Sequence, residues 1–190
     1  CFLLEGLGGG WDDTEALLQE GGMQWAYSEL FQNFSLSELQ NYLQHAHAAS
    51  ERSGLLVHYA ETHDNERLAA HGKQWSLLRN QLSALTSQRG GYGITCGVEW
   101  LADEKIEVHQ SRGMRWGSRN NICQAIARLT HLLHDHPCFQ ADTELQNIPH
   151  TAEDVYLLHR RNGKDEVLVC VNTNPTQEAD LHLPQGQWGY

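Results

Sequence analysis

Two places in the sequence carry side chains that could do acid–base chemistry directly after an apolar run. Glu5 follows the first such run, and His63 and Asp64 stand in a polar cluster that follows the apolar residues 55–60. Such runs are typical of strands covered on both faces, and α/β proteins keep their chemistry at the carboxyl ends of these strands. We therefore expect Glu5 and Asp64 on the same side of a sheet, with their carboxylates within about 10 Å.

Each of these groups also has a structural interpretation. Residues 62–65 could be only a turn or helix cap ahead of the next helix. Glu5 could be a solvated loop carboxylate. The Gly-rich run 6–10 that follows it could cradle a phosphate, but the G-x-G-x-x-G form is absent and no Lys or Arg comes after it.

The elements that would position these groups alternate along the first part of the chain. We expect strands near residues 1–5, 23–27, 55–60 and 92–96. Between them apolar residues recur at helical spacing, and Ser35 and Glu38 are spaced as a capping box at the start of one helix. This alternation is typical of a parallel sheet with right-handed crossovers, and it predicts an α/β fold that is half of a (β/α) barrel.

The pattern changes after the helix that His136-Pro137 should stop. Asn162-Gly163 lies between two β-rich runs, which is a strong hairpin signal. We therefore expect residues 1–140 to form the half barrel and residues 141–190 to begin an antiparallel β domain.

Three segments, taken together, resemble the α-amylase family of glycoside hydrolases and transglycosidases. The segment from Thr62 to Arg67, Thr-His-Asp-Asn-x-Arg, resembles the fourth conserved region of that family. Residues 2–6 look like its fifth barrel strand, which ends in the acid/base glutamate, and residues 90–99 are similar to its eighth-strand segment. Three motifs in the right order are more specific than one.

The sequence also departs from the family pattern. Thr62 stands where the family usually has Asn before His-Asp. Tyr92 and Cys96 replace the Pro and Tyr of the eighth-strand segment. These departures leave the substrate subclass open. The residues of the motifs look closest to those of debranching or glucanotransferase members.

The resemblance implies roles for individual residues. Glu5 would be the catalytic acid/base, Asp64 the catalytic carboxylate that grips sugar hydroxyls and stabilises the transition state, and His63 a hydrogen-bond donor to the same sugar. Arg67 belongs to the same motif and would also serve substrate binding. The activity implied is hydrolysis or transfer of α-glucosidic bonds in glycogen- or starch-type α-glucans by a retaining mechanism.

Two tryptophans beyond strand ends, Trp11 and Trp100, could add sugar contacts. The C–H face of a pyranose is complementary to an aromatic ring, although core packing is the commoner role for tryptophan. Trp25 and Tyr59 lie inside the expected strands, and we expect them to pack in the core.

The chain looks like a piece of a longer polypeptide. It begins at Cys1 and stops at Tyr190, straight after the strand-like residues 181–183. In the resembled family the nucleophilic aspartate ends the fourth strand, which would precede Cys1. We therefore expect this piece alone to be inactive and to need the remainder of its own barrel. The alternative is a non-catalytic glucan-binding or structural module.

Composition argues against several partners. The net charge is −11 and no Lys or Arg occurs before Arg52, which disfavours nucleic acid. No apolar run approaches the roughly 20 residues that span a membrane. The five cysteines are scattered, which favours free thiols in a reducing, cytoplasmic compartment. Neither a cofactor nor a metal is expected: His131, His134 and His136 could suggest zinc, but their spacing does not share one helical face.

Overall fold

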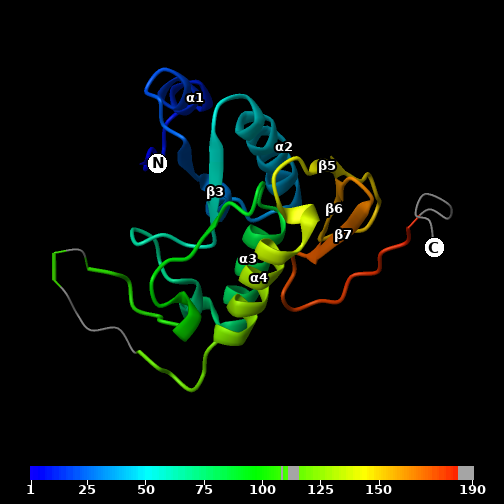
Figure 1. Ribbon diagram of the computed structural model, residues 1–190. Helices are drawn as coiled ribbons and strands as arrows, with labels where there is room; N and C mark the ends of the chain where they lie inside the picture. Colours follow the sequence, from blue (N-terminus) through cyan, green and yellow to red (C-terminus); the bar gives the residue numbers. More distant parts are fainter. Residues whose placement is uncertain (108, 111–115, 184–190) are drawn as a thin grey trace.

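A layer of helices separates two sheets of different kinds in the computed structural model, which describes residues 1–107, 109–110 and 116–183. The parallel sheet lies on one side of the helices and the antiparallel sheet on the other (Figure 1). The strands of the parallel sheet are β1 (Leu3–Leu4), β2 (Trp25–Ser28), β3 (Leu55–Tyr59) and β4 (Tyr92–Gly93). The longer helices are α1 (Trp11–Gln19), α2 (Leu36–Arg52), α3 (Lys73–Leu85) and α4 (Cys123–Asp135).

The parallel sheet has the order β1-β2-β3-β4, so the predicted alternation of strands and helices is confirmed. β4 is shorter than the expected 92–96, because β3 ends at Tyr59 and only Tyr92 and Gly93 find pairing partners on it. A short 3₁₀ helix follows each of the last three strands of this sheet. These helices are η1 (Glu29–Gln32) after β2, η2 (Leu68–His71) after β3 and η3 (Val98–Trp100) after β4.

One face of the parallel sheet packs on the helices. Ala26 of β2 and Leu56 of β3 are buried there against Leu18 of α1 and the small residues Ala46 and Ala49 of α2. The Ser35–Glu38 capping box forms as predicted and fixes the start of α2. Because alanine side chains are small, α2 can lie close against the strands. These alanines therefore set the distance between the sheet and the helix layer.

The opposite face of the sheet is more open. Because side chains alternate along a strand, Trp25 points away from the helices that cover Ala26. Trp25 is 43% exposed, and Leu3, its neighbour on β1, is 41% exposed. The expectation that Trp25 packs in the core is therefore wrong, since among the described residues nothing covers this face at its position.

The antiparallel sheet comprises β5 (Glu144–Asn147), β6 (Val155–Asn162) and β7 (Asp165–Asn172), in that order. The predicted hairpin at Asn162-Gly163 is confirmed, and Gly163 adopts the left-handed conformation that such a turn needs. β5 was not predicted, because its sequence lacks a β-rich run. Residues 181–183 form no strand, and residues 184–190 of the second predicted domain lie outside the described residues.

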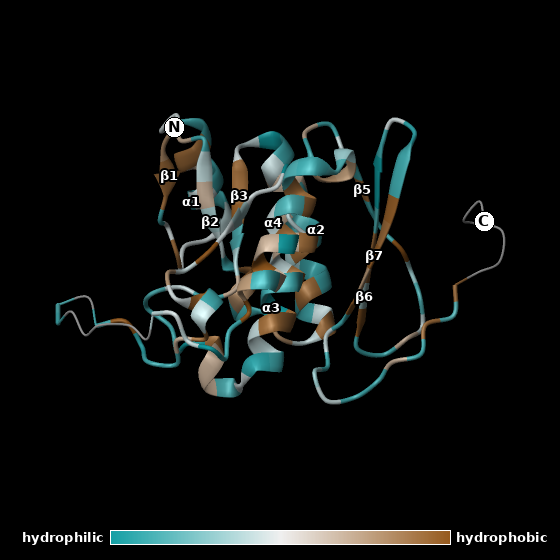
Figure 2. Ribbon diagram, turned by 60° about the horizontal axis from the view of Figure 1, so that its bottom comes forward, coloured by the Kyte–Doolittle hydropathy of each residue, from teal (hydrophilic) through white to brown (hydrophobic). Residues whose placement is uncertain are grey.

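The larger hydrophobic core joins the antiparallel sheet to the helices. It combines Leu43 of α2, Leu82 of α3 and Leu129 of α4 with Tyr156 and Leu158 of β6. Figure 2 shows hydrophobic segments, in brown, on the helices and on the strands beside them. The helix α4 stops before Pro137, as predicted, and the 3₁₀ helix η4 (Pro137–Phe139) leads from it toward β5.

Two further expectations concern the whole chain. All five cysteines are free thiols, as predicted. Within the part of the chain that the structure describes, no helix combines the length and the apolar character needed to cross a membrane.

Candidate active site

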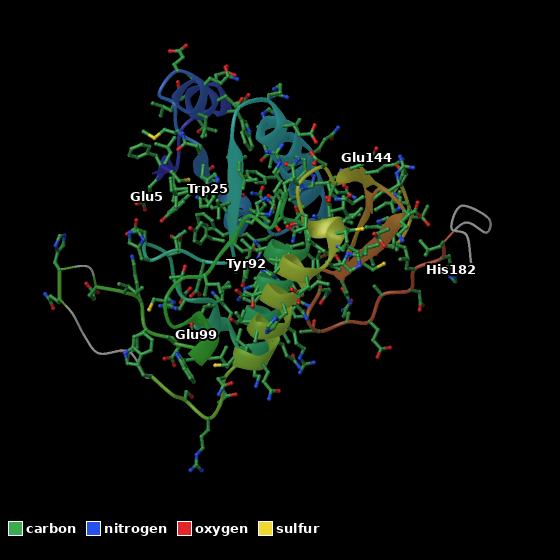
Figure 3. The ribbon with its side chains drawn as sticks, viewed as in Figure 1. Glu5, Trp25, Tyr92, Glu99, Glu144 and His182 are labelled. Carbon is green, nitrogen blue, oxygen red and sulfur yellow. The ribbon has the colours of Figure 1, made fainter. Side chains whose placement is uncertain are left out.

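Three side chains from two strand ends converge at the carboxyl edge of the parallel sheet. Glu5 follows β1 directly, and His63 and Asp64 follow β3. His63 Nε2 lies 3.8 Å from Glu5 Oε1 and 3.4 Å from Asp64 Oδ2. One polar atom of each residue lies within 4.8 Å of the other two, so the expected proximity of the two carboxylates is confirmed. Figure 3 shows Glu5 at the blue strands β1 and β2, where Trp25 also lies.

The cluster is open to solvent. The side chains of Glu5, His63 and Asp64 are 49%, 35% and 65% exposed, so a ligand could reach all three. Two carboxylates with an imidazole between them can donate and accept protons and hydrogen bonds at one small centre. The same three residues could also hold a cation, but exposed acidic groups commonly gather without one.

The loop that carries His63 and Asp64 is held from beneath by a buried ion pair. Arg67 Nε donates a hydrogen bond to Glu61 Oε1 at 2.7 Å, and both side chains are almost completely buried. The second oxygen of Glu61 accepts the backbone N–H of Leu68 at 2.7 Å. Burial raises the pKa of Glu61, while Arg67 opposes that rise.

The ion pair also ties this loop to the next strand end. Arg67 Nη2 donates to the carbonyl of Cys96 at 3.0 Å. Thr95 Oγ1 donates to the carbonyl of Glu61 at 2.5 Å. Because Thr95 and Cys96 follow β4, these bonds fix the loop after β3 against the segment after β4. The Glu61–Arg67 clamp, as we call this pair, leaves His63 and Asp64 at the tip of a braced loop.

A tyrosine pair stands beside Glu5 on the open face of the sheet. The rings of Tyr27 and Tyr59 lie 4.7 Å apart, and burial, Tyr27 and the nearby Glu5 raise the pKa of Tyr59 to about 12. Gly93 makes room for this pair, because a Cβ at that position would lie 2.2 Å from the Tyr59 ring. The strand position of Tyr59 suggested core packing, and nothing in the sequence alone placed Tyr27 next to it.

The structure does not bring the other three predicted site residues into this cluster. Arg67 is fully buried in the clamp, so its guanidinium does not face the open site. Trp11 packs on α2, with its ring 5.1 Å from Tyr42 and 4.1 Å from His45. Trp100 is half-buried in η3, and Figure 3 shows its neighbour Glu99 well apart from Glu5.

Comparison with known proteins identifies the architecture. No protein-family model and no curated protein matches the sequence. Solved structures do match the fold. A γ-CGTase from Alkalophilic bacillus clarkii has a TM-score of 0.72 at 19% identity, and the match covers 92% of this chain and 28% of that one. An α-amylase from Geobacillus thermoleovorans, complexed with acarbose, has a TM-score of 0.70 at 15% identity, covering 90% of this chain and 41% of that one.

This chain has the fold of part of an α-amylase-family enzyme. A third match, a maltogenic α-amylase AmyB from Thermotoga neapolitana, has a TM-score of 0.67 at 19% identity and covers 81% of this chain and 39% of that one. The chain thus spans less than half the length of each of these proteins. The amylase-like fold comprises the four-stranded parallel sheet with its helices, followed by the three-stranded antiparallel sheet.

Proposed function

We propose that this chain supplies part of the active site of an α-amylase-family hydrolase or transglycosidase that acts on α-glucosidic bonds in glycogen- or starch-type glucans. The observation that carries the proposal is the convergence of Glu5, His63 and Asp64 at the carboxyl edge of an amylase-like parallel sheet. The same three residues stand in the sequence segments that resemble the family motifs.

The geometry suits cleavage of an acetal. Glu5 would donate a proton to the leaving oxygen and later accept one from the incoming water or sugar hydroxyl. Asp64 would grip sugar hydroxyls and stabilise the positive charge that develops on the sugar carbon, with His63 donating a hydrogen bond beside it. Retention is what the resemblance to the family implies, and it needs a nucleophilic carboxylate besides Glu5 and Asp64.

The covalent nucleophile would come from outside this chain, in the remainder of the barrel. The exposed Trp25 and Leu3 support this part of the proposal, because they give the open face of the sheet an apolar surface on which further strands could pack. This chain alone should therefore lack glucan turnover, whereas the intact gene product should have it.

Matched substitutions in the intact gene product test the proposal. Glu5→Gln and Asp64→Asn should each cut glucan turnover by several orders of magnitude, because the amides keep the volume but remove the proton and the charge. Glu66→Gln is the control, since Glu66 is an exposed carboxylate on the same loop. Reducing-sugar release and glucan transfer are measured together with glucan binding. Full turnover by the Glu5→Gln protein would reject the proposal, and glucan binding without turnover in the wild type would favour a binding module.

A further inference from the structure

A cavity lies near the carboxyl ends of β1 and β2, on the side of the sheet that faces α2. It has a volume of about 260 Å³. Its walls come from the loop after Glu5 and the start of α1, from the end of β2 with η1, and from α2 and β3. The lining residues are Gly6, Gly9, Trp11, Thr14, Tyr27, Glu29, Gln32, Asn33, Tyr42 and Leu56.

The size and chemistry of this cavity select a class of ligand. Cavities of roughly 300–1,000 Å³ take drug-sized molecules, so this one suits a single ring. Two aromatic residues from the helices, Trp11 and Tyr42, stand beside carboxamides and a hydroxyl. Its lining, as far as the structure describes it, contains no lysine, arginine or histidine, which disfavours phosphate and other anions.

The walls are already fixed by contacts within the protein. The hydroxyl of Tyr42 accepts the backbone N–H of Glu29 at 2.6 Å and lies 3.1 Å from Ser28 Oγ. Asn33 Nδ2 donates to the carbonyl of Glu29 at 3.0 Å. Burial raises the pKa of Tyr42 to about 12, so this hydroxyl stays neutral. The cavity therefore needs little rearrangement to receive a ligand.

Other polar groups of the lining remain available. The side chains of Thr14 and Gln32 make no hydrogen bond or ion pair within the described part of the chain. Both can donate and accept, as sugar hydroxyls do. An aromatic surface with amide and hydroxyl groups beside it matches the two sides of a pyranose, its C–H face and its hydroxyl rim.

The geometry points to a second sugar site in this cavity, separate from the Glu5–Asp64 cluster, that takes one neutral hexopyranose unit of a glucan. The inference rests on the proposed function for the choice of a glucose-type ligand. The site also touches the loop of the proposed acid: Gly6 follows Glu5 directly, and the N–H of Gly8 donates to Glu29 Oε1. A bound sugar would therefore contact the loop that carries Glu5.

Titration of the intact protein with glucose and maltose tests this site. The indole N–H signal of Trp11, assigned by its absence in a Trp11→Phe protein, reports on the cavity. Glucose should shift this signal saturably. Gln32→Ala should weaken that binding roughly fivefold, the value of one hydrogen bond between neutral groups. The matched control is Gln44→Ala, because Gln44 is exposed on α2 and does not line the cavity.

An Asp64→Asn protein separates this inference from the proposed function. It should lose glucan turnover but keep the Trp11 shift, because Asp64 does not line the cavity. If Asp64→Asn removes the shift, or Gln32→Ala leaves it unchanged, the second site is rejected while the proposed function stands. A larger shift with tetramethylammonium than with glucose would also overturn the inference, since aromatic rings beside Glu29 would then be binding a cation.

Discussion

Two fully buried arginines, Arg67 and Arg160, hold together two regions of this molecule in different ways. Arg67 braces the loop of His63 and Asp64 through a carboxylate partner, Glu61. Arg160 of β6 instead donates to backbone carbonyls and to no carboxylate among the described residues. It donates to the carbonyls of Cys138, Leu85 and Ser87 at 2.8, 2.9 and 2.9 Å, and its guanidinium lies 4.2 Å from the Phe139 ring centroid.

The difference separates a site brace from a structural joint. Leu85 ends α3 and Ser87 follows it, so Arg160 places its charge at the negative end of a helix and fastens the antiparallel sheet to the helix layer. The Glu61–Arg67 clamp instead connects two strand ends beside the open carboxylates. A change at Arg67 should therefore alter both activity and stability, whereas a change at Arg160 should alter stability alone.

The largest effect should follow from breaking the clamp. Arg67→Met leaves Glu61 buried without its cation, which costs about 3–5 kcal/mol. It also frees the loop of His63 and Asp64, so kcat for glucan turnover should fall at least tenfold even in the folded fraction. Turnover per folded molecule, measured well below the unfolding temperature, checks this. Arg67→Lys should recover part of the turnover, and an Arg67→Met protein with unchanged kcat would show that the clamp is structural only.

Removing the Arg160 contacts should have a somewhat smaller effect on stability and should cause no loss of turnover. Arg160→Met leaves three buried carbonyls without their donor, so the free energy of unfolding should fall by about 3 kcal/mol. The neighbouring Arg161→Met is the matched control, because Arg161 is exposed and forms a surface ion pair with Glu144, and it should leave stability nearly unchanged. Denaturant unfolding of both proteins checks this. Equal destabilisation by the two substitutions would contradict the joint.

The smallest effect per residue concerns two buried histidines, His47 and His58, whose pKa the nearby Arg160 helps to lower. Burial lowers the pKa of His58 to about 3 and that of His47 to about 4, while their ordinary pKa in the unfolded chain is about 6.5. Below pH 6.5 the unfolded chain binds protons that the folded chain does not, so stability falls as the pH falls. The loss should reach about 2 kcal/mol for each histidine at pH 5.

Unfolding free energies at pH 7 and pH 5 measure this acid sensitivity. His58 Nδ1 lies 3.3 Å from the carbonyl of Ser83, a contact that a neutral amide could replace in His58→Gln. These two histidines should make the free energy of unfolding lower at pH 5 than at pH 7. In the His58→Gln protein, this difference should be about half as large. If His58→Gln has the same pH dependence as the wild type, His58 binds a proton as readily in the folded chain as in the unfolded chain, which would contradict the lowered pKa.

Much of the fold follows from local sequence rules. The Ser35–Glu38 spacing, the Asn162-Gly163 turn and the apolar run before Tyr59 each depend on neighbours in the chain, and the corresponding elements form as predicted. Glu5 and Asp64 were expected together because both follow strands of one parallel sheet, and their proximity is confirmed. The roles assigned to them stay predictions.

What sequence reasoning missed depends on contacts between distant segments. Arg67 stands in the motif beside His63 and Asp64, but only the fold shows that its partner is the buried Glu61. Trp11 was expected at the catalytic cluster because it follows a strand end, yet its ring packs against Tyr42 and His45 of α2. The sequence held one signal for the clamp. Glu61 and Arg67 carry opposite charges and stand six residues apart, at the two ends of a polar loop, so they can pair across it.

The most direct measurement of the central claim, that Glu5 is the proton donor, compares leaving groups. A fluoride departs from a glucosyl fluoride without protonation, whereas the oxygen of a glucan needs a proton. In the intact protein, Glu5→Gln should lose glucan turnover by several orders of magnitude but retain far more of its fluoride release. Asp64→Asn should lose both, because the charge that it stabilises develops with either leaving group. Equal losses on both substrates for Glu5→Gln would contradict the role of Glu5 as the acid.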